Sequence, residues 1–425
     1  MRHSGIVFAF IFLYGLGAST VRAEEMRDLR KAVEAQGSVI NELREELERV
    51  RSEQGRAQDR VLALEDQLAL RPVSAGGPSE SGITADYIDR RIEAFQTSDN
   101  SRFFMSGYGN IRYRDVMDDG DIDGNPPSTY LVQFNPIFHF RLTDRLHFNS
   151  ELEIELDDGG ETEIELEFGT IDYLLNDWLT LSAGKFFTPF NVFGADLHPA
   201  WINKMASRPV IYDKNKGVIP VMTDVGIMAS GGAPLWNEDS KLNYAVYMGN
   251  GPVAEDEDEP ALEFENTPDE NNNKTSGGRI GFLPIPNLEL GASWSTGRTK
   301  GPGGRFNLLG SDLWYWNDGL ELRGEYVRLS RKSEDRLDKW GYYLQVAYRM
   351  SYYLTDPTGW SGVVGRFEPV IRWGQTKGFN PDNRDQLALG LNYWLYPSVP
   401  LKLTYEFNQG KVKNDRLFLQ LAYGF

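Results

Sequence analysis

The sequence predicts an all-β fold class: a 16-stranded antiparallel transmembrane β-barrel preceded by a periplasmic α-helical coiled coil. Three observations predict it. The final strand alternates in polarity and ends on an aromatic residue, polar and apolar side chains alternate from residue 102 onward, and a heptad repeat runs ahead of them. The chain divides into residues 1–23 (signal peptide), 24–70 (coiled coil), 71–101 (linker and short helix) and 102–425 (barrel).

The last strand is the most informative stretch. Every second residue is large and apolar, and the residues between them include Gln420, Ala422 and Gly424. The apolar set is Leu417, Leu419, Leu421, Tyr423 and Phe425. A period of two with one apolar face indicates a strand, and an outer-membrane barrel commonly ends on such a strand.

The first 23 residues have the pattern of a secretory signal. Arg2 and His3 precede an apolar run from Gly5 to Ala18, and Ala23 follows Val21 at the cleavage position. The run is shorter than the roughly 20 residues that a membrane-spanning helix needs. Since no other stretch of that length is apolar throughout, the sequence excludes a helical membrane protein.

Composition excludes several functions. The chain has no cysteine, which rules out disulfides and Cys-based metal sites. Its formal net charge of −18 argues against nucleic acid as a partner. The 43 glycines and many aromatic residues fit a large β-protein with solvated loops.

Residues 24–70 predict a coiled coil, because apolar positions alternate in spacings of three and four. The seam is Met26, Leu29, Val33, Gln36, Ile40, Leu43, Leu47, Val50, Gln54, Ala57, Val61, Leu64 and Leu68. We expect a coiled coil of three helices, one from each protomer, to match a trimeric barrel. The alternative is a single amphipathic helix folded on its own barrel. Residues 71–101 predict a Gly/Pro/Ser-rich linker and a short helix near 84–96.

From residue 102 the alternation predicts sixteen strands, so both ends of the barrel lie on one side of the membrane. Turns near 143–144, 176–177, 285–286, 317–318 and 397–398 are short and are expected in the periplasm, together with the coiled coil. The expected strands are 102–115, 129–143, 145–157, 161–175, 178–187, 222–231, 239–250, 277–284, 287–298, 303–315, 319–330, 337–353, 363–375, 384–395, 399–409 and 413–425.

Two strands indicate which face is inside. Along 146–156 apolar residues alternate with His147, Asn149 and three glutamates, and along 401–407 they alternate with Lys402, Thr404 and Glu406. A soluble sandwich would bury the apolar faces, but so much charge fits a wet lumen and a lipid exterior better. An interfacial aromatic girdle is expected from Trp178, Trp314, Trp316, Tyr352, Tyr353, Trp394, Tyr396, Tyr423 and Phe425.

The same phases predict the residues that line the lumen. Six glutamates on neighbouring strands should point inward, opposite cations on the preceding strands. The acidic set is Glu151, Glu153, Glu155, Glu163, Glu165 and Glu167, and the facing set is Arg112, Arg114, His139 and Arg141. Further inward candidates are Arg323, Glu325, Arg349, Arg366, Glu368, Arg372 and Lys402. Such walls either bias ion flow or pair as salt bridges that stiffen the barrel.

The long segment 189–221 is too apolar and aromatic to extend into water. We expect it to fold into the barrel and narrow it, presenting Lys204, Arg208, Lys214 and Lys216 with Asp196 and Asp213. An external lid or a contact between protomers is the alternative. The acidic loop 255–273 is interpreted as a solvated external loop rather than a divalent-cation site.

Catalysis has little support in the sequence. After the signal, only His139, His147 and His198 remain, and Ser150 falls on the face of its strand opposite His147. There is no zinc spacing and no phosphate-binding loop. We therefore expect no enzyme activity, no metal and no cofactor.

The chain resembles Gram-negative trimeric outer-membrane porins, in particular the phosphate-selective porin O/P type and related porins with an N-terminal coiled coil. The resemblance rests on L-S-A-G-K-F-F-T-P-F at residues 181–190, on the sixteen strands that end at Phe425, and on the heptads. It implies a homotrimer with one channel per protomer and an inward loop. It also implies that Lys185 lines the constriction.

The expected function is a water-filled channel for passive diffusion of small hydrophilic or charged solutes across the outer membrane of a Gram-negative bacterium. Its expected partners are outer-membrane lipid and lipopolysaccharide, further copies of the chain, and the solutes or ions that pass. The alternative is a structural anchor whose coiled coil spaces the membrane from the cell wall.

Overall fold

The computed structural model divides the chain into two units, Met1–Gly77 and Pro78–Phe425. It describes residues 102–117, 128–156, 160–213, 217–236, 239–254, 262–263, 272–299, 304–332, 336–350, 359–378, 383–410 and 414–425. The expected signal peptide, coiled coil, linker and short helix all lie outside these residues, as do Lys214, Lys216 and most of the acidic loop.

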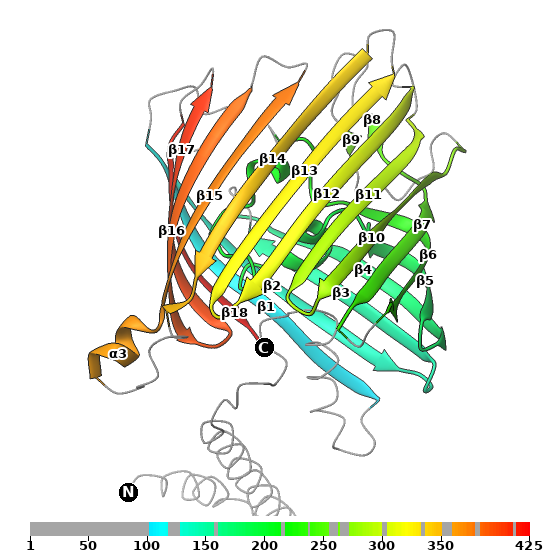
Figure 1. The fold of residues 1–425 in the computed structure, drawn as a ribbon, viewed down its shortest axis with the longest axis horizontal. Coiled ribbons are helices and arrows are strands. Elements are labelled where there is room, and N and C mark those ends of the chain that lie inside the picture. Colours follow the sequence, from blue (N-terminus) through cyan, green and yellow to red (C-terminus); the bar gives the residue numbers. More distant parts are fainter. Residues whose placement is uncertain are drawn as a thin grey trace, which may run out of the picture. The chain divides into compact units, whose positions relative to one another are not determined.

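Sixteen antiparallel strands close into a barrel, which confirms the predicted fold class for this part of the chain (Figure 1). Every strand pairs with its sequence neighbour in the barrel, and β18 closes it against β1. The strands are β1 (Phe103–Val116), β2 (Ser128–Arg141), β3 (Leu146–Leu156), β4 (Thr162–Asn176), β5 (Leu179–Phe187), β6 (Thr223–Pro234), β7 (Lys241–Gly249), β10 (Thr275–Ile285), β11 (Leu288–Arg298), β12 (Arg305–Asn317), β13 (Leu320–Lys332), β14 (Arg336–Tyr348), β15 (Phe367–Gly378), β16 (Arg384–Tyr396), β17 (Val399–Gly410) and β18 (Arg416–Gly424).

The chain terminus seals the barrel. The Gly107 amide donates to the Phe425 carbonyl at 3.0 Å, and the Phe425 amide donates to the Gly107 carbonyl at 2.9 Å. Closure leaves neither β1 nor β18 with an open edge, which is the condition for a sheet to cross lipid. A separate two-stranded sheet, β8 (Val253–Ala254) and β9 (Leu262–Glu263), lies in the connection between β7 and β10.

The connections separate into two ends, as predicted. Residues 142–145, 177–178, 286–287, 318–319 and 397–398 make short turns at the end that also holds the C-terminus (Figure 1). The opposite end carries the 188–222 and 250–274 connections, and one longer connection, 349–366 with α3 (Gly359–Val364), lies at the short-turn end. Short turns on one side and longer loops on the other are the arrangement of an outer-membrane barrel.

One expected pair of strands was misplaced. β14 ends at Tyr348 rather than near residue 353, and α3 (Gly359–Val364) occupies the first part of the expected strand 363–375. The reason is local, because Val363 and Val364 are consecutive apolar residues and the alternation that a strand needs begins only after Gly365. β15 therefore starts at Phe367.

The outward face is apolar, as the alternation predicted. Ile227 is 62% exposed, and Leu309 and Leu344 are each 56% exposed. The inward face instead buries polar residues, among them Glu325, Arg372 and Glu406. Apolar side chains outside and polar ones inside are the reverse of the distribution in a soluble protein, and they fit a barrel with lipid outside and water within. Among the described residues, no helix is long and apolar enough to span a bilayer.

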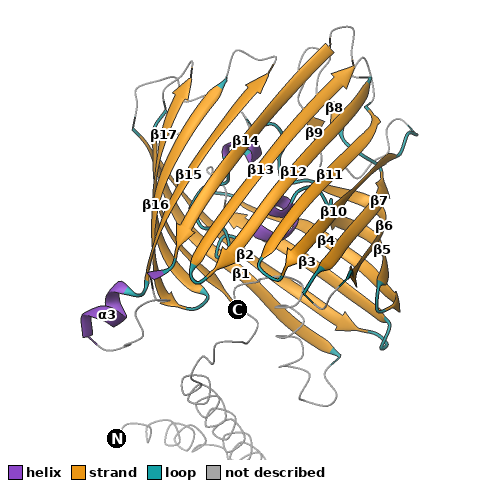
Figure 2. Ribbon diagram, viewed as in Figure 1, coloured by secondary structure: helices purple, strands orange, loops and turns teal. Residues whose placement is uncertain are grey.

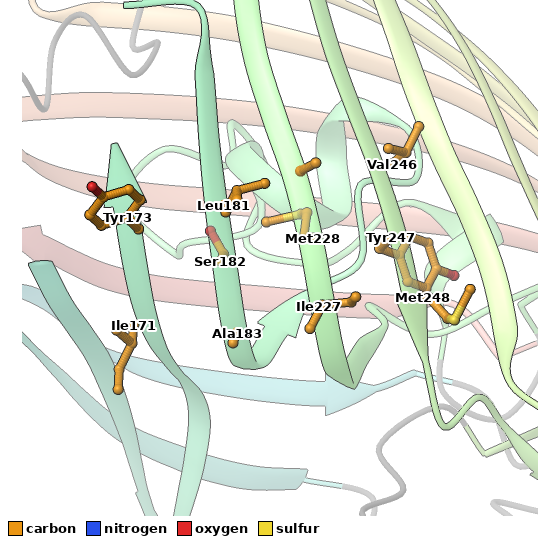
Figure 3. Close-up of a pocket in the computed structure, with 11 residues that line it drawn as sticks. Ile171, Tyr173, Leu181, Ser182, Ala183, Ile227, Met228, Val246, Tyr247 and Met248 are labelled. Carbon is orange, nitrogen blue, oxygen red and sulfur yellow. The ribbon is translucent and has the colours of Figure 1, made fainter. Parts of the chain in front are cut away.

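The outer surface also carries an apolar hollow of about 560 Å³ over β4 to β7 (Figure 3). Two small residues, Ala183 and Ala229, lie between larger neighbours and create the depression. The larger outward-facing neighbours are Ile171, Tyr173, Leu181, Ile227, Val246 and Met248.

The aromatic girdle was predicted only in part. Trp178 and Tyr396 are 57% and 71% exposed at the short-turn end, and Phe425 is also exposed there. Trp314, Trp316 and Trp394 instead point into the barrel and are buried. Their strand phase explains the error, because they alternate with outward residues such as Leu313. Tyr352 and Tyr353 lie outside the described residues.

Candidate functional site: a loop folded into the barrel

The described residues of the connection between β5 and β6, 188–213 and 217–222, pack inside the barrel. The connection contains two short helical turns, η1 (Phe193–Leu197) and η2 (Val210–Tyr212), which Figure 2 shows within the barrel outline. Its apolar side chains form one cluster with inward residues of β12, β13 and β14. The wall contributes Phe306, Leu308, Trp314, Trp316, Val327, Leu329 and Tyr343. Burial of this apolar surface explains why the loop is not polar.

Glycines on the wall make room for the loop. A Cβ added at Gly341 would lie 2.8 Å from Ile211, and one added at Gly374 would lie 2.8 Å from Val210. The same holds at Gly390, where the added atom would lie 2.6 Å from the Met205 sulfur. The loop can therefore approach the β14–β16 backbone more closely than a wall of larger residues would allow.

Glu325 on β13 holds the first part of the loop, at Phe193, and its last part, at Tyr212, together. Its carboxylate accepts hydrogen bonds from the Phe193 amide at 2.7 Å and from the Tyr212 hydroxyl at 2.5 Å. The Asn191 side chain donates to the same carboxylate at 3.4 Å. Burial and the neighbouring Glu325 charge raise the pKa of Tyr212 well above its ordinary value, so the hydroxyl remains a donor.

Arg372 on β15 and Glu406 on β17 hold the segment around residue 207. Both side chains are fully buried, with Arg372 Nη2 3.3 Å from Glu406 Oε1. Arg372 donates to the Ser207 carbonyl at 3.0 Å and to the Arg208 carbonyl at 3.1 Å. Ser207 donates in turn to Glu406. A buried pair that satisfies so many groups positions the loop on β15–β17.

A second polar cluster joins Lys204 to the short-turn half of the wall. Lys204 Nζ lies 2.9 Å from Glu368 and 3.4 Å from Glu321. Glu368 also accepts from Asn392 and from the Trp394 indole, each at 3.0 Å. Four strands, β13, β15, β16 and, through Lys402, β17, therefore contribute to this attachment.

Lys402, Arg323 and Arg349 are inward, as predicted. Lys402 is buried and donates to the carbonyl oxygens of Ala200 and Asn203. Arg323 pairs with Glu321 and lies over the Trp314 ring at 5.7 Å. Arg349 lies over the Trp394 ring at 4.1 Å. Lys402 thus holds the loop directly, whereas Arg323 and Arg349 pack against tryptophans of the inner wall.

Asp213 fixes the last part of the loop. It lies 3.1 Å from Arg384 and 3.4 Å from Arg416. Arg416 also pairs with Glu406 at 2.9 Å, which links this attachment to the Arg372 cluster. The described loop is thus attached from β11, where Ser293 accepts from the Asn191 amide at 3.0 Å, round to β18.

The opposite wall carries the predicted glutamates. Glu153 pairs in register with Glu165, and Glu155 pairs with Glu163, so these carboxylates share the lumen face. Glu167 continues the alternation of Glu163 and Glu165 and interacts with Glu153, and a register shift after Glu151 pairs Glu151 with Phe168. The register thus places these glutamates on one face of β3 and β4, and their part in conduction stays a prediction.

Neighbouring donors compensate part of this negative charge. Glu151 accepts from the Tyr108 hydroxyl at 2.8 Å and from the Asn135 amide at 2.9 Å. Arg208 of the loop interacts electrostatically with Glu153 and Glu167 across the lumen. The loop and the acidic wall therefore present opposite charges to each other.

Arg112, Arg114 and Arg141 also lie on inward phases. Arg112 donates to the Ala206 carbonyl of the loop at 3.3 Å. Arg114 pairs in register with Phe418, which is buried inside. Arg141 pairs with His147 toward the short-turn end.

Two predicted lumen residues lie elsewhere. Lys185 shares the outward phase of β5 with Leu181 and Ala183, while Ser182 and Phe186 point inward. It therefore does not reach the constriction, and the expectation from the family resemblance was wrong. Arg366 is exposed ahead of β15, where its amide donates to the Val363 carbonyl at 3.2 Å, so it belongs to the short-turn end.

A chain of polar side chains crosses β1 to β4 near the same end. Asn149 donates to Asp172 at 2.6 Å and contacts His139 Nδ1 at 2.7 Å, and His139 Nε2 lies 3.2 Å from Ser106. Asp172 fixes the Asn149 amide so that its oxygen faces His139, which makes Nδ1 the protonated nitrogen and leaves Nε2 to accept from Ser106. The sequence alone pointed to Ser150 beside His147; Ser106 comes close to His139 only through the register of β1 against β2.

His198 in the loop has a different environment. Its ring lies 4.7 Å from the Phe187 ring. Burial, reinforced by the nearby Arg208 charge, lowers the pKa of His198 to about 3. The imidazole is therefore neutral near pH 7 and packs as part of the loop.

Several residues of the site were not anticipated. Glu406 and Asn392 hold the loop, and Arg279 forms a compact ion cluster on β10–β12, 2.8 Å from Glu289 and 2.5 Å from Asp312. The phase of 401–407 already placed Glu406 inward, but its partner Ser207 could not be known without the path of the loop. Across the described residues, no group of three or more potential metal ligands is assembled.

Comparison with known proteins supports the architecture. No protein-family model matches the chain, and no curated protein matches it. Among solved structures, it is similar to OmpF of Salmonella typhi in complex with daunomycin, with a TM-score of 0.53, 11% identity, and coverage of 77% of this chain and 99% of that one.

The anion-selective porin from Comamonas acidovorans gives a TM-score of 0.51 at 12% identity, covering 76% of this chain and 99% of that one. The chain has the fold of Gram-negative porins. At such low identity the similarity concerns the porin barrel, and solute preference has to be argued from the residues of this chain.

Proposed function

We propose that this protein is a passive channel in the outer membrane of a Gram-negative bacterium, through which small hydrophilic solutes diffuse. The observation that carries the proposal is the attachment of residues 188–222 to the inner wall from β11 to β18. A loop held by buried ion pairs is a fixed constriction: it narrows the lumen and does not swing across it. The part of the inner wall that the loop leaves uncovered is charged.

We further infer that the channel passes cations in preference to anions. The loop attachments use Lys204, Arg372 and Lys402, whose charges are compensated by carboxylates or loop carbonyl oxygens. On the opposite wall, exposed Glu163 and Glu165 lie beside Glu153 and Glu155. An acidic wall raises the local concentration of cations and lowers that of anions.

The finer features of the proposal rest on sequence. The homotrimer rests on the family resemblance, and the periplasmic stem rests on the heptads of residues 24–70. Lipid and lipopolysaccharide as surrounding partners follow from the apolar outward face.

Planar-bilayer recordings of the full mature chain test the proposal. We expect stepwise conductance increases that scale with salt concentration, and a reversal potential in a KCl gradient whose sign reports cation preference. A barrel that inserts without conducting would contradict the channel, whereas a reversal potential of anion sign would contradict only the selectivity.

The Ser106–His139–Asn149 chain allows a separate check. As a passive channel, the protein should leave a serine-reactive fluorophosphonate probe unattached and should hydrolyse no ester. Covalent labelling of Ser106, lost in Ser106→Ala, would show that this polar chain activates a nucleophile and that the protein is more than a channel.

A further inference from the structure

Basic residues form one transverse row across the ends of four neighbouring strands. Arg298 on β11 pairs in register with Arg305 on β12, and Arg305 pairs with Lys332 on β13. Lys332 pairs with Arg336 on β14, so the row continues without interruption. These strand ends lie opposite the short turns, at the top of the barrel in Figure 1.

The described side chains of this row point outward. Arg298 shares its strand phase with Trp294, and Arg305 shares its phase with Leu309, which is 56% exposed on the lipid side. Lys332 shares its phase with Tyr326. Arg298, Arg305 and Lys332 are themselves exposed, so the row faces the surroundings of the barrel and not its lumen.

Two more cations extend the patch. Arg328 lies on the same face of β13 and contacts Asp338 at 3.2 Å. Lys377 on β15 lies 5.8 Å from the centre of the Trp340 ring. We call Arg298, Arg305, Arg328, Lys332 and Lys377 the outer basic patch. Two acidic residues lie beside it on the described outward face: Asp338 contacts Arg328, and Asp385 on β16 pairs with Gln375, next to Lys377 on the same face of β15. The patch contrasts with a chain whose net charge is −18.

Such a row is unfavourable by itself. Like charges at directly opposed positions of neighbouring strands repel each other, and a transverse row repeats that repulsion at each strand pair. An anion with several charges, placed against the row, would convert the repulsion into attraction. Arg and Lys at this spacing suit phosphate groups, to which Arg can donate two parallel hydrogen bonds.

The depth of the patch indicates what kind of anion it meets. Trp294 and Trp340 lie on the same outward face in the register row of Arg328 and Lys377, and Tyr326 and Trp373 lie further toward the middle of the barrel; all four are at least partly exposed. Aromatic side chains are enriched where a bilayer changes from hydrocarbon to polar head groups. Basic residues just beyond that belt lie at head-group level, where clusters of Lys and Arg bind phosphate-bearing lipids.

We propose that the outer basic patch on β11–β15 binds the phosphate groups of lipopolysaccharide in the outer leaflet. This inference rests on the proposed function in one respect, the orientation that sets the short turns in the periplasm. The site is independent of the lumen, because its side chains lie on the opposite face of the sheet from the loop attachments.

The test uses the full mature chain in detergent and titrates it with lipid A that carries two phosphates, read by native mass spectrometry. The variant is Arg305→Gln/Lys332→Gln. The matched control is Arg145→Gln/Arg366→Gln, which removes two exposed cations at the short-turn end. Dephosphorylated lipid A and phosphatidylglycerol are the comparison lipids, and bilayer conductance is recorded for every variant.

We expect the patch variant to bind diphosphorylated lipid A at least roughly tenfold more weakly than the wild type, while the control variant binds as the wild type does. Dephosphorylated lipid A should bind weakly to all three. Equal binding by wild type and patch variant would overturn the proposal, and so would equally tight binding of phosphatidylglycerol, which would assign the patch to ordinary phospholipid. Conductance should be unchanged in the patch variant; loss of conductance in the wild type would overturn the channel and leave the lipid result standing.

Discussion

The two halves of the barrel wall use the same residue types for different purposes. On β13–β18, Glu325, Arg372 and Glu406 are buried and hold the inward loop. On β3–β4, Glu163 and Glu165 are exposed on the lumen face. The difference arises from what lies opposite each wall, because the strand alternation that points these side chains inward is the same.

The comparison shows that an inward charge has two possible roles in a barrel. Where a loop covers it, a charge must be paired and hydrogen-bonded, since desolvation without partners costs several kcal/mol. Where water covers it, the charge remains available to passing ions. The loop thus decides which half of the wall is structural and which half acts on solutes.

The largest expected effect comes from removing that division. We expect replacement of residues 190–220 by a short Gly/Ser linker to raise single-channel conductance by at least roughly twofold, because both halves of the wall would then face water. The control deletes α3 at the opposite end of the barrel and should conduct as the wild type does. Unchanged conductance without the loop would show that the loop does not narrow the path of ions.

Breaking one buried attachment should have a smaller but related effect. Arg372→Ala removes the donor to the Ser207 and Arg208 carbonyls and leaves Glu406 with one buried partner fewer. We expect a loss of about 3 kcal/mol in the free energy of unfolding and noisier, larger conductance steps as the loop detaches.

Urea unfolding and bilayer recordings measure the two effects of Arg372→Ala. Arg145→Ala removes an exposed arginine in the short turn 142–145 and should change neither. If Arg372→Ala lowered stability but left the conductance steps identical, the loop would be held well enough by Glu325 and Lys402 alone.

The fold and the inward phases could be predicted from alternation, because a period of two fixes both the strand and its faces. Sixteen strands and the inward positions of Arg323, Arg372 and Lys402 follow from that rule. Which of them face water could not be predicted, since this depends on the path of a loop whose contacts lie more than a hundred residues away, as for Phe193 and Glu325.

For Lys185 the family resemblance predicted an inward side chain, whereas the strand alternation around it predicted an outward one. The alternation of Leu181, Ser182 and Ala183 already placed Lys185 on the outward phase of β5. The glycines that accommodate the loop, such as Gly374, were equally visible in the sequence. The role of these glycines could not be read from the sequence, because a glycine in a strand indicates that another group comes close but not which group it is.

Selectivity should change when the water-covered wall loses charge. We expect Glu153→Gln/Glu165→Gln, a directly opposed pair, to lower the cation-to-anion permeability ratio by roughly twofold with little change in conductance. Reversal potentials in a KCl gradient measure it. Asp144→Asn/Asp385→Asn removes two exposed carboxylates, in a short turn and on the outward face, and should leave the ratio unchanged.

The smallest effects should come from the glycines, and their ranking tests how closely the loop packs. At Gly390 an added Cβ would meet the sulfur of Met205, a flexible side chain, so Gly390→Ala should cost under about 1 kcal/mol. At Gly374 the added atom would lie 2.8 Å from Val210 and 2.9 Å from the Tyr342 carbonyl, which cannot move aside, so Gly374→Ala should cost about 1–3 kcal/mol.

Gly169 on β4 is the control for these glycines, because it pairs with the outward Lys185, away from the loop, and the nearest atom to its added Cβ is Leu166 Cδ2 at 3.4 Å. Gly169→Ala should be nearly neutral in urea unfolding. Equal losses at Gly169 and Gly374 would mean that strand glycines matter for the backbone alone. The largest loss of unfolding free energy at Gly374, a smaller loss at Gly390 and none at Gly169 would show that the loop is packed against the β14–β16 wall as tightly as a protein interior.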